Sequence, residues 1–124
     1  MRYKRDESFR YDFKPSLEGT FEIVQMNEKA VQVSAGTLFI VNLSPSGVGI
    51  KTHYNLPDPE LYTVTLQLTC TLEDSPLVFK GNVQWKRQSS VDYSYGLELS
   101  SSEETKKEIV SLLKRHALNQ ATST

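Results

Sequence analysis

This 124-residue chain has one cysteine, one tryptophan and no large excess of positive or negative charge. The single cysteine, Cys70, excludes an internal disulfide, and only His53 and His116 accompany it, which disfavours a zinc site. The formal net charge is −1, so the chain as a whole is not a binder of polyanions. Any site for an anion must therefore be a local cluster of basic residues.

Long apolar runs are also missing. Met1 is followed by charged residues, no stretch resembles a signal peptide, and none approaches the length that spans a membrane. The composition, 38% hydrophobic and 23% charged, is that of a soluble globular protein with one core. We expect a single-domain cytoplasmic protein without membrane insertion.

The N-terminal arm, residues 1–13, is both basic and aromatic. Four of the 14 basic residues fall within its first ten positions, interleaved with Tyr3, Phe9, Tyr11 and Phe13. A solvated tail and a docked, ligand-facing arm both fit this pattern. Pro15 is expected to end any regular structure before the first strand begins.

Short apolar segments linked by turns make up most of the remaining chain. They predict a mainly β fold, a small antiparallel β-barrel of about six to seven strands. The clearest alternation places Val64, Leu66, Leu68 and Cys70 on one face, which makes Cys70 a core residue. Residues 37–41 are apolar on both faces and predict either a strand that is covered on both sides or a central strand of the barrel. The expected strands are residues 17–26, 31–33, 37–41, 48–54, 61–70, 77–87 and 93–99.

The last element is a predicted C-terminal α-helix that packs on the barrel. Ser101 and Glu104 suggest a capping box, and Glu103 and Lys107 a pair at four-residue spacing. One helical face carries the apolar residues Ile109, Leu112, Leu113 and Ala117. A helix that binds a partner through this face is the alternative. We therefore expect an arm over 1–13, the barrel with its helix over 14–118, and a flexible tail over 119–124.

A polar segment, Asn-Leu-Ser-Pro-Ser-Gly at residues 42–47, separates two apolar runs and predicts a turn between two strands. Pro45 fixes one φ angle, and Gly47 allows a φ that is closed to other residues. No nucleophile elbow, phosphate loop or dinucleotide-binding glycine motif occurs. The sequence thus predicts a binding protein and not an enzyme.

Taken together, two N-terminal arginines, the order Asn-x-Ser-x-x-Gly and a barrel closed by a helix resemble the PilZ domain family. Residues 83–85 and 95–99 are similar to that family's late strand pair. The resemblance covers nearly the whole chain. It implies a bacterial receptor for the second messenger cyclic di-GMP, which passes the signal to a separate effector in motility, secretion or exopolysaccharide production.

The resemblance also implies a ligand site and no cofactor. Arg5 and Arg10 would contact phosphate or guanine, since the guanidinium fork suits both. Asn42 and Ser44 would bond guanine edges, and Gly47 would allow close approach of backbone and ligand. Four residues separate Arg5 from Arg10, where the family usually has three, and the matching position is Asp6. Arg10 is the firmer assignment.

Two other functions compete with this one. A PilZ-fold interaction scaffold that does not bind nucleotide fits the altered arginine spacing. A barrel that stacks single-stranded nucleic acid on Tyr3, Phe9 and Tyr11 is disfavoured by the negative net charge. We therefore predict neither DNA nor RNA as a partner.

Overall fold

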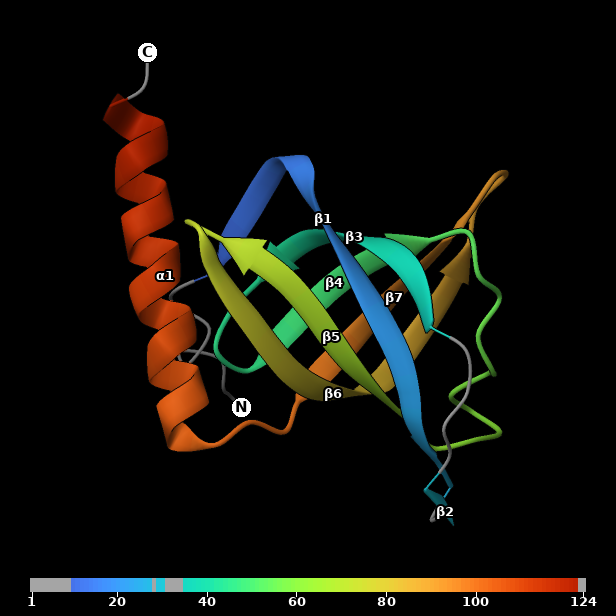
Figure 1. Cartoon of the computed structure of the whole chain (residues 1–124). Coiled ribbons are helices and arrows are strands. Elements are labelled where there is room, and N and C mark those ends of the chain that lie inside the picture. The colour runs from blue at the N-terminus through green and yellow to red at the C-terminus, as the bar shows by residue number, and fades with distance from the viewer. Residues whose placement is uncertain (1–9, 28, 31–34, 123–124) are drawn as a thin grey trace, which may run out of the picture.

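A computed structural model describes residues 10–27, 29–30 and 35–122 of the chain. In these residues, seven strands are followed by one helix (Figure 1). The elements are β1 (Tyr11–Met26), β2 (Lys29–Ala30), β3 (Ala35–Leu43), β4 (Gly47–Thr52), β5 (Val64–Leu72), β6 (Ser75–Gln88), β7 (Tyr93–Leu99) and α1 (Glu103–Thr122).

Six of these strands close into an antiparallel barrel. The order is β1-β3-β4-β7-β6-β5, and β5 pairs back with β1, while the two-residue β2 adds to the other edge of β1. Closure leaves these six strands without a free edge. The predicted fold, a small barrel with a C-terminal helix, is confirmed. Among the described residues, no helix has both the length and the apolar character that crossing a membrane requires.

The core is filled by the inward-facing residues of each strand. On β5, Val64, Leu66 and Leu68 have no exposed surface, and the intervening threonines and Gln67 face outward. Cys70 belongs to the same inner row and is 5% exposed. Burial raises the pKa of its thiol to about 11, which keeps it protonated and unreactive. The prediction of a core cysteine is confirmed.

Strand β3 is buried on one face only. Its burial alternates, with Leu38 and Ile40 buried and Phe39 46% exposed between them. Coverage on both faces is therefore wrong, whereas the alternative, a strand inside the barrel, agrees with the position of β3 between β1 and β4. The described elements form one layer of barrel wall, so only the inward face of β3 meets the core.

Strand β1 begins earlier than predicted, at Tyr11, and continues past Pro15. The expected arm of residues 1–13 therefore overlaps β1 by three residues. The pairing of β1 with β3 shifts register between Asp12 and Leu17, and the cis Lys14-Pro15 bond lies within that shift. Since Pro lacks an N–H, an interruption in the ladder is where a strand tolerates it. The return strand expected at 31–33 lies outside the described residues.

Helix α1 starts at Glu103, and its N-cap is one residue later than predicted. Ser102, and not Ser101, is the N-cap, because its Oγ accepts a hydrogen bond from the Thr105 N–H at 3.1 Å. Glu103 pairs with Lys106 at 3.8 Å in place of Lys107. The helix continues to Thr122, so residues 119–122, expected in the flexible tail, are helical.

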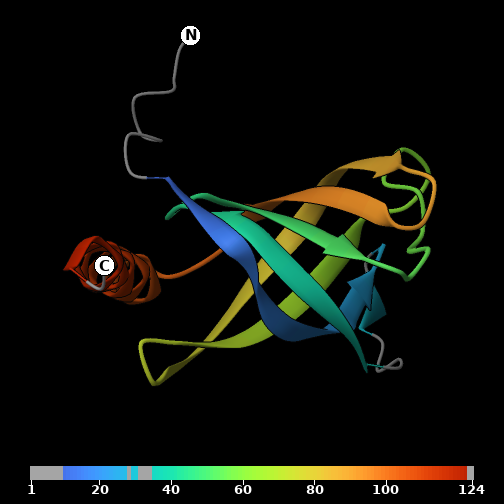
Figure 2. The ribbon, with the colours of Figure 1, turned by 90° about the horizontal axis from the view of Figure 1, so that it is seen from above.

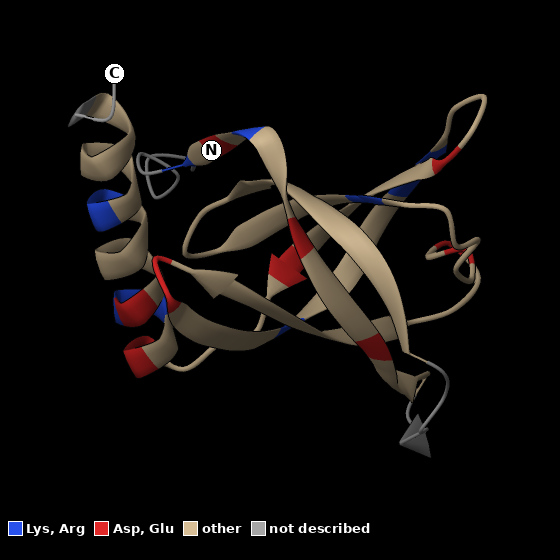
Figure 3. Cartoon of the chain, turned by 45° about the horizontal axis from the view of Figure 1, so that its top comes forward, with Lys and Arg blue, Asp and Glu red and all other residues tan. Residues whose placement is uncertain are grey.

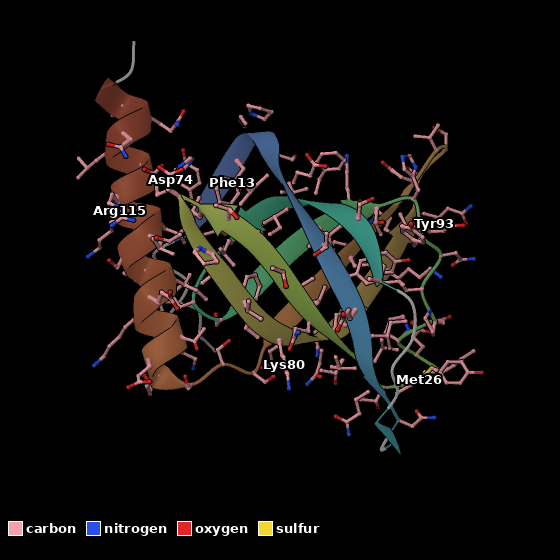
Figure 4. All side chains as sticks on the ribbon, in the orientation of Figure 1. Phe13, Met26, Asp74, Lys80, Tyr93 and Arg115 are labelled. Atoms are coloured by element: carbon pink, nitrogen blue, oxygen red, sulfur yellow. The ribbon has the colours of Figure 1, made fainter. Side chains whose placement is uncertain are left out.

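The helix lies beside one end of the barrel (Figures 1 and 2). Its inner face carries Ile109, Leu112 and Leu113, which are at most 5% exposed and join the barrel core. This confirms that the apolar stripe packs on the barrel. Figure 4 shows Phe13 and Asp74 on the helix side of the barrel, with Tyr93 and Met26 toward the opposite end.

Candidate functional site: a cleft on the outer face of the barrel

A cleft of about 480 Å³ runs over the outer face of four neighbouring strands, β3, β4, β7 and β6. Small-molecule sites are commonly of this size. We call it the outer cleft. Its lining comprises Arg10, Val41, Asn42, Ser44, Ser46, Gly47, Val48, Gly49, Ile50, Lys51, Gln84, Trp85, Arg87, Ser94, Tyr95, Gly96, Leu97 and Glu98.

One end of the outer cleft is formed by the β3–β4 turn. The Ser44 N–H donates to the Gly47 carbonyl at 2.9 Å, and the Gly47 N–H donates to Ser44 Oγ at 3.1 Å. Ser44 is only 2% exposed, so its hydroxyl holds the turn. The Leu99 N–H donates to the Ser46 carbonyl at 2.9 Å, which ties the turn to the end of β7. The turn is thus fixed on two sides.

The turn is shorter than the predicted one. Asn42 is the penultimate residue of β3, opposite Gly49, and Leu43 is fully buried opposite Val48. Burial of Leu43 extends the strand into the expected loop. No glycine among the described residues has a positive φ, so Gly47 does not use the conformational freedom that the sequence offers there.

A row of residues in register crosses the floor of the outer cleft. Asn42 pairs with Gly49, Gly49 with Gly96, and Gly96 with Trp85. We call these four the glycine row. Their neighbours along the strands, such as Ile50 and Tyr95, are buried in the core, so the row faces outward.

Side chains lie directly over the two glycines of this row. A Cβ on Gly96 would lie 2.1 Å from Trp85 Nε1, and a Cβ on Gly49 would lie 3.0 Å from Asn42 Nδ2. The indole and the carboxamide therefore lean inward over a floor of bare backbone. This leaves a polar amide at one side of the cleft and an aromatic ring at the other.

The outer cleft is more basic than the chain. Of its described lining residues, Arg10, Lys51 and Arg87 are cationic and Glu98 is the one carboxylate, whereas the whole chain carries a net charge of −1. Figure 3 shows acidic and basic residues spread over both the barrel and α1, so this local balance is not a property of one whole face. A concave surface with this excess attracts anions.

A family model supplies the decisive comparison, because the PilZ domain model matches residues 4–115. The chain belongs to the PilZ family. The match spans most of the arm, the barrel and most of α1.

Solved PilZ structures share this fold. The inhibitor of motility MotI/DgrA from Bacillus subtilis aligns with a TM-score of 0.68 at 16% identity, covering 97% of this chain and 55% of that one. The PilZ domain of CeSA from a cellulose-synthesizing bacterium gives 0.59 at 10% identity, covering 91% and 99%. PlzA from Borreliella burgdorferi, in complex with c-di-GMP, gives 0.51 at 13% identity, covering 97% and 55%.

These neighbours are too distant in sequence to carry more than the fold. The chain spans about half the length of MotI/DgrA and of PlzA, and nearly all of the CeSA domain. No curated protein matches the sequence.

The structure brings four of the five residues expected to bind a PilZ ligand to one place. Asn42, Ser44 and Gly47 line the outer cleft, and Arg10 lies beside them. Arg10 takes this position because the next residue, Tyr11, pairs with Leu43 just before the turn. Arg5 lies outside the described residues.

Four other prominent lining residues were not predicted from the PilZ resemblance. Gly49 and Lys51 were read only as part of a strand, and Trp85 and Arg87 as part of another. Glycine at the centre of a strand is a signal of close approach that could have pointed to Gly49. No periodicity in the sequence could have placed Trp85 on the outer face, because a bulge in β6 determines which way it faces: the pairing with β7 shifts register between Val83 and Trp85.

Proposed function

We propose that this protein is a cytoplasmic bacterial receptor for cyclic di-GMP, which relays the signal to a separate effector in motility, secretion or exopolysaccharide production. The observation that carries the proposal is the convergence of Arg10 with the Asn42-to-Gly47 motif at one cleft. PlzA, which shares the fold, is in complex with c-di-GMP, and MotI/DgrA is an inhibitor of motility.

The chemistry of the cleft suits such a ligand. Cyclic di-GMP has two phosphates and two flat guanines, whose edges offer both donors and acceptors. Arg10 supplies a guanidinium for phosphate or for guanine O6 and N7. The carboxamide of Asn42 offers both a donor and an acceptor. Asn42 and Trp85 cover Gly49 and Gly96, so a flat ring that enters the cleft would meet the carboxamide and the indole.

Calorimetric titration with cyclic di-GMP tests the proposal. The wild-type chain should bind, and Arg10→Ala should weaken binding by tenfold or more, a loss of at least about 1.4 kcal/mol. Lys14→Ala is the matched control, because Lys14 is an exposed cation of β1 outside the cleft lining. Absence of wild-type binding at high micromolar ligand would overturn the proposal.

A PilZ-fold scaffold without a nucleotide is the second candidate. The four-residue spacing between Arg5 and Arg10, with Asp6 between them, favours it. A scaffold would retain a protein partner equally with and without cyclic di-GMP and would show no heat of binding. The titration above therefore separates the two candidates.

A further inference from the structure

The start of strand β1, which carries Arg10 to the outer cleft, has a short stretch of backbone pairing. Tyr11 and Asp12 pair with the end of β3, the register then shifts, and pairing with β3 resumes at Leu17. Pairing with β5, on the other side of β1, begins at Gly19. Because the end of a strand frays when few backbone bonds hold it, side-chain contacts are needed to fix the direction of Arg10.

Helix α1 supplies such contacts through rings. Successive side chains of a strand point to opposite sides, so Tyr11 packs against the core where Arg10 lines the cleft. The ring centre of Tyr11 lies 5.0 Å from that of Phe13 and 5.2 Å from that of His116, which it meets edge to face at 82°. We call these three residues the ring cluster. Edge-to-face pairs attract one another beyond their buried area, so the cluster fixes the residue next to Arg10.

His116 is itself held in place. Its side chain is 18% exposed, and its Nδ1 lies at hydrogen-bond distance from Glu73 Oε2 in the turn between β5 and β6. The neighbouring Arg115 donates from Nη2 to the Glu73 carbonyl at 3.4 Å. Leu112 and Leu113, one turn earlier in α1, are buried in the barrel core. The imidazole is therefore a fixed support for Tyr11.

The turn that reaches His116 has an unusual backbone. Glu73 and Asp74 both have positive φ, 54° and 64°, in a two-residue turn where Asn and Gly are favoured. A glutamate in this conformation costs backbone energy, which points to a use for its side chain. The carboxylate of Glu73 is the group that contacts His116. Figure 4 shows Asp74 of the same turn on the side of the barrel that faces Arg115.

We propose that Tyr11 and His116 are positioning residues for the nucleotide. They hold the start of β1 on helix α1, so that Arg10 points into the outer cleft, and neither of them belongs to the cleft lining. The inference rests on the proposed function. It makes the affinity for cyclic di-GMP depend on a helix at the end of the barrel, and it ties a ligand-bound Arg10 to that helix.

Calorimetric titration of His116 variants with cyclic di-GMP tests the inference. His116→Ala removes the ring and should weaken binding about fivefold. His116→Phe keeps a ring beside Tyr11 without the bond to Glu73, and should bind within about twofold of the wild type. His116→Asn keeps a donor for Glu73 and loses the ring, so it should bind as weakly as His116→Ala. Ser111→Ala, at an exposed position of α1, is the control and should bind like the wild type.

A double-mutant cycle with Arg10 separates positioning from a general loss of structure. If the ring acts through Arg10, His116→Ala should cause less than about a twofold further loss of affinity in the Arg10→Ala background. An equal loss in both backgrounds would show that His116 acts on the fold as a whole and would overturn the inference. Where a variant does not fold, as judged by circular dichroism, or the Arg10→Ala background binds too weakly to measure, the contrast between His116→Phe and His116→Asn decides.

The outcomes separate this inference from the function on which it rests. Binding by the wild type with the same affinity in His116→Ala, or with equal affinities in His116→Phe and His116→Asn, would overturn the role of the ring cluster and leave the receptor intact. No binding by the wild type would overturn both. Weak binding by His116→Asn together with normal binding by His116→Phe would support the ring cluster.

Discussion

Glu73 and His116 join the β5–β6 hairpin to helix α1, with Glu73 Oε2 2.7 Å from His116 Nδ1. The imidazole also meets the start of β1, since its ring centre lies 5.2 Å from that of Tyr11 and 5.5 Å from that of Phe13. Asn119 donates to the other oxygen of Glu73. The hairpin, the helix and the residue that follows Arg10 therefore meet at one point.

This contact predicts a loss of stability in acid. The pKa of Glu73 is lowered, and the hydrogen bond with His116 is the largest cause. Burial, the second cause, raises this pKa, while Asn119 and the charges of His116 and Arg115 lower it further. A carboxyl whose pKa is lower in the folded chain stabilises the fold above its unfolded pKa, near 4.5, and loses that effect as pH falls through the folded pKa. Glu73→Gln should therefore unfold at lower temperature than the wild type at pH 7, and this difference should shrink below about pH 4.5.

Thermal unfolding followed by circular dichroism between pH 3 and pH 8 measures the difference. Glu22→Gln is the control, because Glu22 is an exposed carboxylate on β1. A constant gap between Glu73→Gln and the wild type across this range would contradict the assignment.

Truncation of the helix core should be costly. Leu113 has no exposed surface and packs in the barrel core, so Leu113→Ala removes buried methyl groups and leaves a cavity. We expect a loss of about 2–5 kcal/mol in the free energy of unfolding, measured by denaturant titration. Leu118→Ala is the matched control, because Leu118 is 67% exposed, and it should change stability by no more than about 0.5 kcal/mol. Equal effects of both substitutions would argue against helix packing on the core.

The barrel was predictable because its signal is repeated. The alternation of Val64, Leu66, Leu68 and Cys70 fixes which face of β5 is buried, and similar patterns recur in other strands. Element ends were less predictable, because tertiary contacts decide them. Burial of Leu43 lengthens β3, and the ladder interruption lets β1 pass Pro15.

The site was predictable only where a linear motif describes it. Asn42, Ser44 and Gly47 are adjacent in sequence, and Arg10 was found through the same family resemblance. The opposite side of the cleft depends on the pairing of Trp85 with Gly96, which a one-residue bulge creates. A bulge leaves no period of its own in the sequence, and simple alternation along β6 would put Trp85 on the same face as Val83.

Gly96→Ala should displace the indole even without ligand. The added Cβ would lie 2.1 Å from Trp85 Nε1, a distance that forces the ring to move. We expect a shift of the tryptophan emission maximum in the ligand-free protein, since the ring gains contact with water. Gly47→Ala serves as control, because its Cβ would meet only the Leu97 carbonyl at 3.3 Å and Ser44 Oγ at 3.9 Å. An unchanged spectrum in Gly96→Ala would show that the indole does not lie on Gly96.

Substitutions of Ser44 and Asn42 should affect different properties, stability for Ser44 and ligand affinity for Asn42. Ser44 is 2% exposed and its Oγ accepts the Gly47 N–H, so Ser44→Ala leaves that donor unpaired and should cost about 1–3 kcal/mol of stability.

Asn42 is half-buried at the cleft side, where its amide lies over Gly49. Asn42→Ala should change stability by less than about 1 kcal/mol and weaken cyclic di-GMP binding by about tenfold, the loss of about 1.4 kcal/mol. Denaturant titration measures the free energy of unfolding of both variants, and calorimetry measures their affinity for cyclic di-GMP. A stable Ser44→Ala would contradict its role in the turn. Wild-type affinity in Asn42→Ala would remove the amide from the ligand site and leave recognition to the arginines.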